Sequence, residues 1–508
     1  MGCVSESLLP DMNEIAEPVL ESLLKGLNQD QKMAVTASLD SHILVLAGAG
    51  CGKTTVLTKR IAFCMSSGIN SARICALTFT RKAADEMKSR VANLDGIKTQ
   101  SRLPLITTFH GLGLRILSET IGGTLNFCRL GYSRMPRVLS ERDRLEMLAM
   151  VSSRYEREHL NVDLFSLDSL LVQRSVFAEK QTFLSDSQKQ VLKQIADRLE
   201  KFKRERGVWD FSDLITGLIQ LFKENPFLIN TYARRFDMVL VDEFQDTNPV
   251  QIKLLHYLLS NGSVIFAVGD DDQAIYGFRG ADIRPTLEFC NYFKGAKILK
   301  LQTNYRSVPV ILDTANRLFI KKDSAYRKVL VSARYSRIDN RKKPSVHRFE
   351  NMEKLLLWVI STAVCISKKE KIPVKEMALL FRVNQTLDWV NEQIKKISIS
   401  DFPQLLTVHR SKGLEFPVVF LCDLEESVFP AYRLISLKKI GSWMEFASSL
   451  LKGSGWKAAI DCDWEEEKRL FYVAITRAQK YLFFLYTRNK TVYGKRRSYR
   501  QSRLLKLL

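Results

Sequence analysis

A glycine-rich turn between an apolar run and a helix-compatible segment constrains this chain most. Residues 42–46 (HILVL) have the composition of a buried strand, residues 47–55 (AGAGCGKTT) follow directly, and residues 53–65 fit a helix. The glycines allow tight backbone conformations in which N–H groups converge on phosphate oxygens. Lys53 would reach the β- and γ-phosphates of a nucleotide, and the Thr54 hydroxyl would hold Mg²⁺. The pattern predicts a phosphate-binding strand–loop–helix unit.

The match to the common phosphate-loop pattern is not complete. That pattern, G-x-x-x-x-G-K-[ST], begins with glycine, and Ala47 stands at its first place. The alternative is an ordinary glycine-rich turn with a surface lysine. A downstream pair of carboxylates, Asp242 and Glu243, favours the phosphate loop, because the pair follows an apolar run at 239–241. One carboxylate could hold Mg²⁺ while the next orients or deprotonates a water.

The charge balance indicates a polyanionic partner. The chain has 508 residues with 77 basic and 55 acidic side chains, a net charge of +22. Nucleic acid is the commonest partner of so basic a chain, and a generally basic surface is the alternative. The nine cysteines include no C-x-x-C pair, which argues against a zinc module and for a reducing compartment. With no long apolar run and no signal peptide, we expect a cytoplasmic protein without membrane contact.

Strand-like and helix-like segments alternate along most of the chain, which predicts an α/β fold. We expect a lead-in at 1–22, a first α/β domain at 23–295 and a second at 296–508. Several charged amphipathic helices and few strand-like runs predict a helical insertion at about 121–209. A Ser-, Lys- and Gly-rich segment at about 432–461 is expected to be irregular.

Five further side chains are suited to nucleotide contacts. Gln273 follows a strand and could sense the γ-phosphate, which Arg306 and Arg477 could approach from the second domain. Tyr305 could stack on adenine, and the amide of Gln31 could bond its edge. The alternatives are surface ion pairs for the arginines, a core tyrosine, and a polar helix start around Gln31.

Aromatic and basic residues also recur in segments where a nucleic-acid strand could lie. Stacking of bases on aromatic rings is tolerant of sequence. Burial in the core is the alternative for each ring, and it weighs most for Phe109. The candidates are Phe79, Phe109, His110, Tyr276, Phe278, Arg279 and His409.

Taken in order, these segments resemble the UvrD/Rep/PcrA family of superfamily 1 DNA helicases. The similarity extends over residues 26–480. The matching segments are LNQDQ, AGAGCGKTT, LTFTRKAADEM, TTFHGLGLRIL, VLVDEFQDTN, VGDDDQAIYGFRGA, LQTNYRSVPVIL, TVHRSKGLEFPVVFL and EEEKRLFYVAITRA.

The resemblance implies two RecA-like motor domains of the P-loop NTPase class, with ATP between them and single-stranded DNA across them. It assigns Gln31 and Tyr305 to adenine, Glu415 to ribose, and Thr54 with Asp242 to Mg²⁺. It makes Glu243 the water-activating group. It places on the phosphates Ala47, Gly48, Ala49, Gly50, Cys51, Gly52, Lys53, Thr54 and Thr55, and at the γ-phosphate Gln273, Arg306 and Arg477. DNA-facing motifs include Phe79, His110, Tyr276, Phe278, Arg279 and His409.

The chain departs from the family in three places. Members of the family carry an accessory subdomain, called 2B, before the segment that matches TVHRSKG. This chain has only a short segment there, near 397–404, so we expect it to lack 2B. The chain ends soon after the last motif, without the longer tail typical of the family. Phe278 stands where the family usually has Trp.

The resemblance implies an ATP-dependent single-stranded DNA translocase and 3′–5′ helicase in DNA repair or replication. Its partners would be single strands, single-to-double-strand junctions and repair or replication proteins. One alternative is a translocase that displaces proteins from DNA without productive unwinding, which the expected absence of 2B favours. Another is a non-enzymatic, ATP-gated DNA-binding module.

Overall fold

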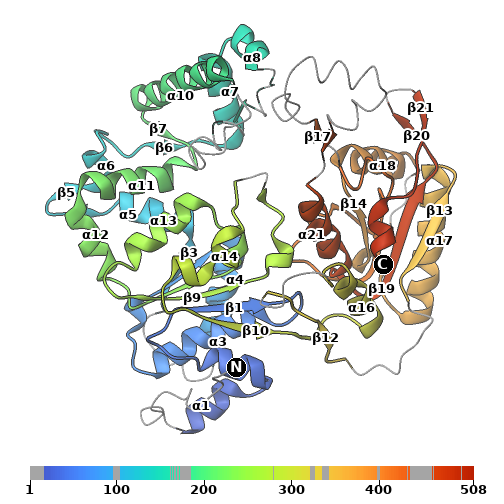
Figure 1. The fold of residues 1–508 in the computed structure, drawn as a ribbon, viewed down its shortest axis with the longest axis horizontal. Coiled ribbons are helices and arrows are strands. Elements are labelled where there is room, and N and C mark those ends of the chain that lie inside the picture. Colours follow the sequence, from blue (N-terminus) through green and yellow to red (C-terminus); the bar gives the residue numbers. More distant parts are fainter. Residues whose placement is uncertain are drawn as a thin grey trace. The chain divides into compact units, whose positions relative to one another are not determined.

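The protein divides into two compact units in the computed structural model (Figure 1). The first unit comprises Met1–Leu46, Lys53–Asp271 and Tyr276–Leu299, and the second comprises Ala47–Gly52, Asp272–Ile275 and Lys300–Leu508. Two short segments of the expected first domain, 47–52 and 272–275, thus group with the second unit. The structure describes residues 17–94, 103–160, 162, 164, 167–168, 171, 185–277, 280–320, 326–334, 343–397, 401–431, 433–434, 460–461, 463–492 and 495–508.

A parallel sheet with the strand order β10-β1-β9-β8-β2-β3 forms the centre of the first unit. Every residue of β1, β2, β8 and β9 is buried, which explains their continuous apolar sequences. The strands are β1 (Ile43–Ala47), β2 (Ile74–Thr78), β3 (Leu105–Thr108), β8 (Met238–Val241), β9 (Val264–Gly269) and β10 (Lys297–Leu301).

Helices connect and cover these strands. The predicted helix at 53–65 is confirmed, since α3 begins at Lys53. Residues 17–24, at the end of the expected lead-in, form helix α1, whose Leu20 and Leu23 are buried. The helices are α1 (Glu17–Leu24), α2 (Gln29–Val35), α3 (Lys53–Ser66), α4 (Arg81–Ala92), α5 (Phe109–Leu117), α11 (Asp213–Glu224), α12 (Pro226–Ala233), α13 (Pro249–Leu258), α14 (Arg284–Leu287) and α15 (Phe289–Tyr292).

The predicted helical insertion is present in the first unit, where Figure 1 shows α7, α8 and α10 grouped apart from the six-stranded sheet. Leu148, Leu192 and Ile195 belong to a small hydrophobic core of its own. The long helix α10 has a capping box at Ser185 and a left-handed Gly207 after its last turn. The elements are β4 (Thr120–Ile121), β5 (Thr124–Leu125), α6 (Asn126–Arg129), β6 (Arg137–Val138), α7 (Glu141–Val151), α8 (Arg154–Leu160), α10 (Asp186–Arg206) and β7 (Val208–Trp209).

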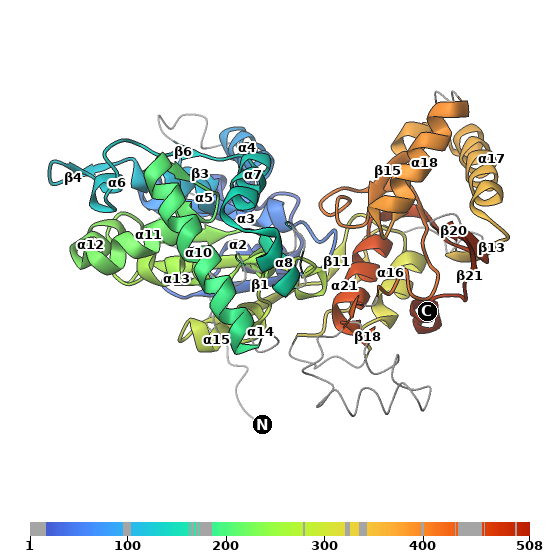
Figure 2. The ribbon, with the colours of Figure 1, turned by 90° about the horizontal axis from the view of Figure 1, so that it is seen from above.

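The second unit contains a parallel sheet with the order β13-β19-β16-β14-β15. Successive residues of β19 face opposite sides: Phe483 packs with the α17 side, whereas Phe484 meets Phe471 of α21. Figure 2 accordingly shows α17 and α18 on one side of the sheet and α16 and α21 on the other. The main elements are α16 (Pro309–Arg317), β13 (Ser345–Phe349), α17 (Met352–Glu370), β14 (Ala378–Phe381), α18 (Asn384–Ile397), β15 (Gln404–Thr407), β16 (Phe416–Leu421), α21 (Trp464–Ile475) and β19 (Ala478–Thr487).

Short elements complete the second unit. Helix α18 ends at Ile397 and β15 begins at Gln404, so the connection where we expected 2B to be absent is brief. The expected irregular segment at 432–461 lies mostly outside the described residues. The remaining strands are β11 (Thr303–Asn304), β12 (Val331–Ser332), β17 (Arg433–Leu434), β18 (Ile460–Asp461), β20 (Asn489–Val492) and β21 (Lys495–Ser498).

Among the helices that the structure describes, none combines the length and apolarity needed to cross a bilayer.

Candidate functional site

Three neighbouring strands bring acidic and basic side chains to one edge of the first unit's sheet. Strand β9 lies between β1 and β8, and all three run parallel. Lys53 opens the helix after β1, Asp242 follows β8, and Asp270 follows β9. The carboxyl ends of parallel strands are where open α/β sheets place their ligands.

Lys53 faces the carboxylate pair predicted from the sequence. Its Nζ lies 3.8 Å from Oε1 of Glu243. Asp242 is buried, and its Oδ1 accepts a hydrogen bond from the N–H of Glu243 at 3.0 Å. Burial, and then the negative charge of Glu243, raise the pKa of Asp242 to about 7. The fold therefore places Lys53 beside the two predicted carboxylates within the first unit.

The residues predicted to hold Mg²⁺ have suitable donors. Asp242 offers a buried carboxylate whose pKa is raised by burial and by the negative charge of Glu243. Thr54 offers a hydroxyl in the first turn of α3. Carboxylate and hydroxyl oxygens are the ligands that Mg²⁺ prefers, so the two residues fit the ion.

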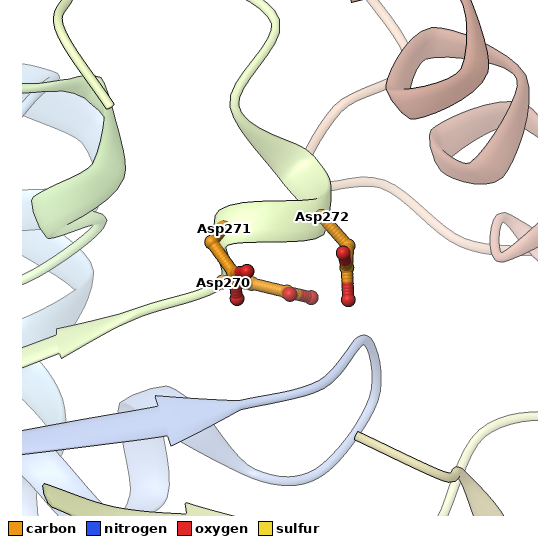
Figure 3. Close-up of side chains that lie close together, drawn as sticks. All are labelled: Asp270, Asp271 and Asp272. Atoms are coloured by element: carbon orange, nitrogen blue, oxygen red, sulfur yellow. The ribbon is translucent and has the colours of Figure 1, made fainter. Parts of the chain in front are cut away.

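A second acidic group, not predicted from the sequence, follows β9. Figure 3 shows Asp270, Asp271 and Asp272 with their carboxylates on the same side of the short helix η4 (Asp271–Gln273), and one oxygen from each lies within 4.8 Å of the others. All three are buried. Asp272 forms an ion pair with Lys328 at 2.9 Å, so part of this charge is compensated by the protein.

The glycine-rich loop 47–52 contacts the segment around Asn304. Asn304 Nδ2 donates to the carbonyl of Ala49 at 2.6 Å, and the N–H of Tyr305 donates to the carbonyl of Gly50 at 3.0 Å. Gly50 has φ +68°, and a Cβ there would lie 2.7 Å from Asn304 Nδ2. This position therefore requires glycine. Of the other loop residues, Ala47, Gly48, Ala49 and Cys51 are buried, and Gly52, Lys53, Thr54 and Thr55 are half-buried.

The predicted γ-phosphate residues of the second unit meet around Thr476. Arg477 is 1% exposed, and its Nη2 donates to Oε1 of Gln273 at 3.2 Å. Arg306 Nη1 donates to the carbonyl of Thr476 at 3.1 Å. Arg306 Nε also donates to Glu415 at 2.6 Å, so the predicted ribose contact is an ion-pair partner here. Arg477 thus contacts Gln273 directly, and Arg306 contacts the backbone of the residue before Arg477.

The two adenine candidates have different environments. Tyr305 is 40% exposed, so the alternative of a core tyrosine is wrong. Gln31 is the third residue of α2, and its Oε1 accepts from the N–H of Asn28 at 3.1 Å in a capping box. The polar helix start is therefore confirmed for Gln31, and its contact with adenine stays a prediction.

The DNA-facing candidates divide into buried and accessible groups. Phe109 is 1% exposed, so its core alternative is confirmed; its ring lies 6.3 Å from that of half-buried Phe79. His110 is half-buried, and burial lowers its pKa. Tyr276 and His409 are also half-buried. Phe278 and Arg279 lie outside the described residues.

Phe211 and Gln245 were missed in the sequence. The Phe211 ring is 50% exposed and meets His110 edge-to-face with centroids 5.6 Å apart. An aromatic residue between two aspartates (DFSD) was the available signal for Phe211. Gln245 is fully buried and donates from Nε2 to Oε2 of Glu243 at 2.5 Å. Its partner depends on the turn after β8, which no spacing rule predicts.

The sequence matches two family models along most of its length. The UvrD/REP helicase N-terminal domain matches residues 27–294. The UvrD-like helicase C-terminal domain matches residues 299–404 and 391–489, two segments that overlap where α18 leads to β15. These matches agree with the predicted pair of α/β motor domains.

Curated relatives carry helicase names. A probable DNA helicase of Mycoplasma pneumoniae is 32% identical over 495 residues, which cover 96% of this chain and 87% of the relative. The putative ATP-dependent DNA helicase YjcD of Bacillus subtilis is 32% identical over 74% of this chain and 48% of its own length. The ATP-dependent DNA helicase PcrA of Staphylococcus aureus is 31% identical over 72% of this chain and 49% of its own length. The chain thus spans about half the length of the last two, and it belongs to the UvrD-like family of ATP-dependent DNA helicases.

Proposed function

We propose that this chain hydrolyses ATP to move along single-stranded DNA in the 3′–5′ direction. The observation that carries the proposal is the placement of Lys53 opposite Glu243, beside the buried carboxylate of Asp242. A lysine at a phosphate loop and two carboxylates after a neighbouring strand are the parts that phosphoryl transfer to water requires.

Each of these side chains has a separate task in the proposed reaction. Lys53 binds the β- and γ-phosphates, and Glu243 orients the attacking water and accepts its proton. Mg²⁺ held by Asp242 and Thr54 would neutralise charge on the phosphates. Arg306 and Arg477 contribute positive charge at the γ-phosphate, where one arginine can be worth ~10³–10⁵ in rate. Gln273, bonded to Arg477, reports whether that phosphate is present.

Single-stranded DNA is the proposed track. Half-exposed Phe211 with His110, together with Tyr276, Phe278, Arg279 and His409, would contact bases and backbone. The net charge of +22 favours such a polyanion. A role in repair or replication is proposed from the family alone.

The experiment that tests the proposal is steady-state ATP hydrolysis with and without a single-stranded oligonucleotide. We expect strong stimulation by the oligonucleotide and dependence on Mg²⁺. Equal rates with and without DNA would contradict translocation, and no hydrolysis in either condition would favour an ATP-gated binding module instead.

A second candidate is a translocase that removes proteins from DNA without productive unwinding. The brief connection 398–403 between α18 and β15, where the 2B subdomain is expected in the family, favours it. Strand displacement from a 3′-tailed duplex, measured beside displacement of a protein bound to the same DNA, separates the two functions. Protein displacement without strand displacement would select the second.

A further inference from the structure

Gln245 is a buried amide that makes a hydrogen bond from each of its two polar atoms. Nε2 donates to Oε2 of Glu243 at 2.5 Å, and Oε1 accepts from the N–H of Asp270 at 2.9 Å. The residue is 0% exposed. Its orientation is fixed by its partners, because a carboxylate only accepts from the amide nitrogen and a backbone N–H only donates to the amide oxygen.

The surrounding backbone is shaped to receive this side chain. Gly269, the last residue of β9, has no side chain, and a Cβ there would lie 2.7 Å from Oε1 of Gln245. Glu243 has φ 48° and ψ 45°, a left-handed conformation that residues with a Cβ adopt rarely. Both features bring the turn after β8 and the end of β9 within reach of one amide.

We propose that Gln245 is a positioning residue for ATP hydrolysis, which holds the Glu243 carboxylate and ties it to the backbone that follows β9. This inference rests on the proposed function, in which Glu243 orients the attacking water. Gln245 donates to Oε2 of Glu243, and the other carboxylate oxygen, Oε1, faces Lys53 at 3.8 Å. A carboxylate held at one oxygen keeps a fixed direction, and catalytic groups need such support from their neighbours.

The link also joins two segments that the proposed cycle must coordinate. Asp270 begins the loop that carries Gln273 and Tyr276. One side chain therefore bonds both the first N–H of that loop and the carboxylate proposed to orient the water.

Two substitutions separate the two hydrogen bonds. Gln245→Met has a similar volume and removes both. Gln245→Glu keeps an acceptor for the Asp270 N–H but sets a carboxylate against Glu243 in place of a donor. Gln251→Met is the matched control, since Gln251 is 4% exposed and accepts a capping hydrogen bond from the N–H of Asn248 at 3.0 Å.

The readouts are kcat and KM for ATP, and hydrogen exchange at the Asp270 amide resolved with overlapping peptides. We expect kcat to fall roughly 10–100-fold in both Gln245 variants, with KM changed less than about twofold. The Asp270 amide should exchange faster in Gln245→Met and stay protected in Gln245→Glu. Gln251→Met should leave both readouts at the wild-type values.

The outcomes distinguish this inference from the proposed function. If the wild type hydrolyses ATP and kcat of Gln245→Met lies within about twofold of the wild-type value, the positioning role is overturned and the proposed function stands. If the wild type hydrolyses no ATP, the proposed function fails. The link is then judged by exchange alone, and an Asp270 amide equally protected in Gln245→Met and wild type would refute it.

Discussion

The Nζ atom of Lys53 lies 3.8 Å from Oε1 of Glu243, although Lys53 opens the helix that follows β1 and Glu243 lies in the turn after β8. The charges attract one another, and the neighbouring Asp242 is buried with its pKa raised to about 7. A phosphate and its cation entering here would meet one positive and two acidic groups within the first unit.

Removing either partner of this pair should stop hydrolysis. In Glu243→Gln the water loses its proton acceptor, and we expect kcat to fall roughly 10²–10⁴-fold. In Lys53→Ala the phosphates lose their cation, so ATP binding should weaken as well. Coupled-enzyme ATPase assays measure both.

Binding of single-stranded DNA should survive in both variants, because neither side chain is proposed to touch it. Glu158→Gln, at a 63% exposed side chain of α8, is the control and should behave as wild type. Turnover of Glu243→Gln near the wild-type rate would remove Glu243 from the proposed mechanism.

Arg477 and Arg306 should respond differently to truncation. Arg477 is buried and donates to the carbonyls of Val473 and Leu414 at 3.0 Å each, so Arg477→Ala leaves buried acceptors unsatisfied. The cost is about 1–3 kcal/mol for each such group. Arg306 donates to one backbone carbonyl, that of Thr476, and pairs with the 48% exposed Glu415 side chain, so its truncation leaves fewer acceptors unsatisfied.

We therefore expect both variants to lose hydrolysis, and Arg306→Ala to lose less stability than Arg477→Ala. Denaturant unfolding of the second unit, measured beside ATPase activity, makes the comparison. Equal stability of the two variants would contradict the structural role assigned to Arg477.

The buried carboxylate Asp213 should make the stability of the first unit depend on pH. Burial, and then the negative charge of Asp210, raise the pKa of Asp213 from 3.8 to about 6. The folded state therefore holds a proton that the unfolded state has released between these values. Binding of this proton stabilises the folded state. The stabilisation is fully present below pH 3.8 and is lost as the pH rises through about 6.

Asp213→Asn should remove this part of the pH dependence between pH 4 and 6, measured as the unfolding midpoint across that range. Asp197→Asn, at an exposed position of α10, serves as the control. If the unfolding midpoint changes equally with pH between pH 4 and 6 in the wild type and in Asp213→Asn, then Asp213 has the same pKa in the folded and unfolded states.

Phe211 should contribute to DNA affinity by stacking. Its ring is 50% exposed beside His110, and base stacking on an aromatic ring is worth ~1–3 kcal/mol. Phe211→Ala should raise Kd for a single-stranded oligonucleotide roughly 5–150-fold, by fluorescence anisotropy. Phe227→Ala is the matched control, since Phe227 is 51% exposed in the same unit and lies under Arg129. Equal affinities of the two variants would remove Phe211 from the track.

Much of this protein was determined by local sequence. Apolar runs such as 43–47 and 238–241 form buried strands because every residue in them is apolar, and Lys53 opens a helix as its spacing predicts. Asp242 and Glu243 come directly after the apolar run 238–241, so their position after β8 is also predicted by the sequence. The motifs and their order along the chain predicted the family, because both can be read from the sequence without knowledge of side-chain contacts.

Only the tertiary structure decided which partners those residues have. Phe109 and His110 are adjacent, yet the first is core and the second meets Phe211. Gln245 reaches both Glu243 and Asp270 because β8 and β9 are neighbours in the sheet. Arg306 reaches the Thr476 carbonyl, an acceptor that every residue type offers. Residue types do not reveal the order of strands in a sheet or which backbone carbonyl a side chain will contact. The spacing of motifs therefore predicts which residues form the site, and the fold decides which of them contact one another.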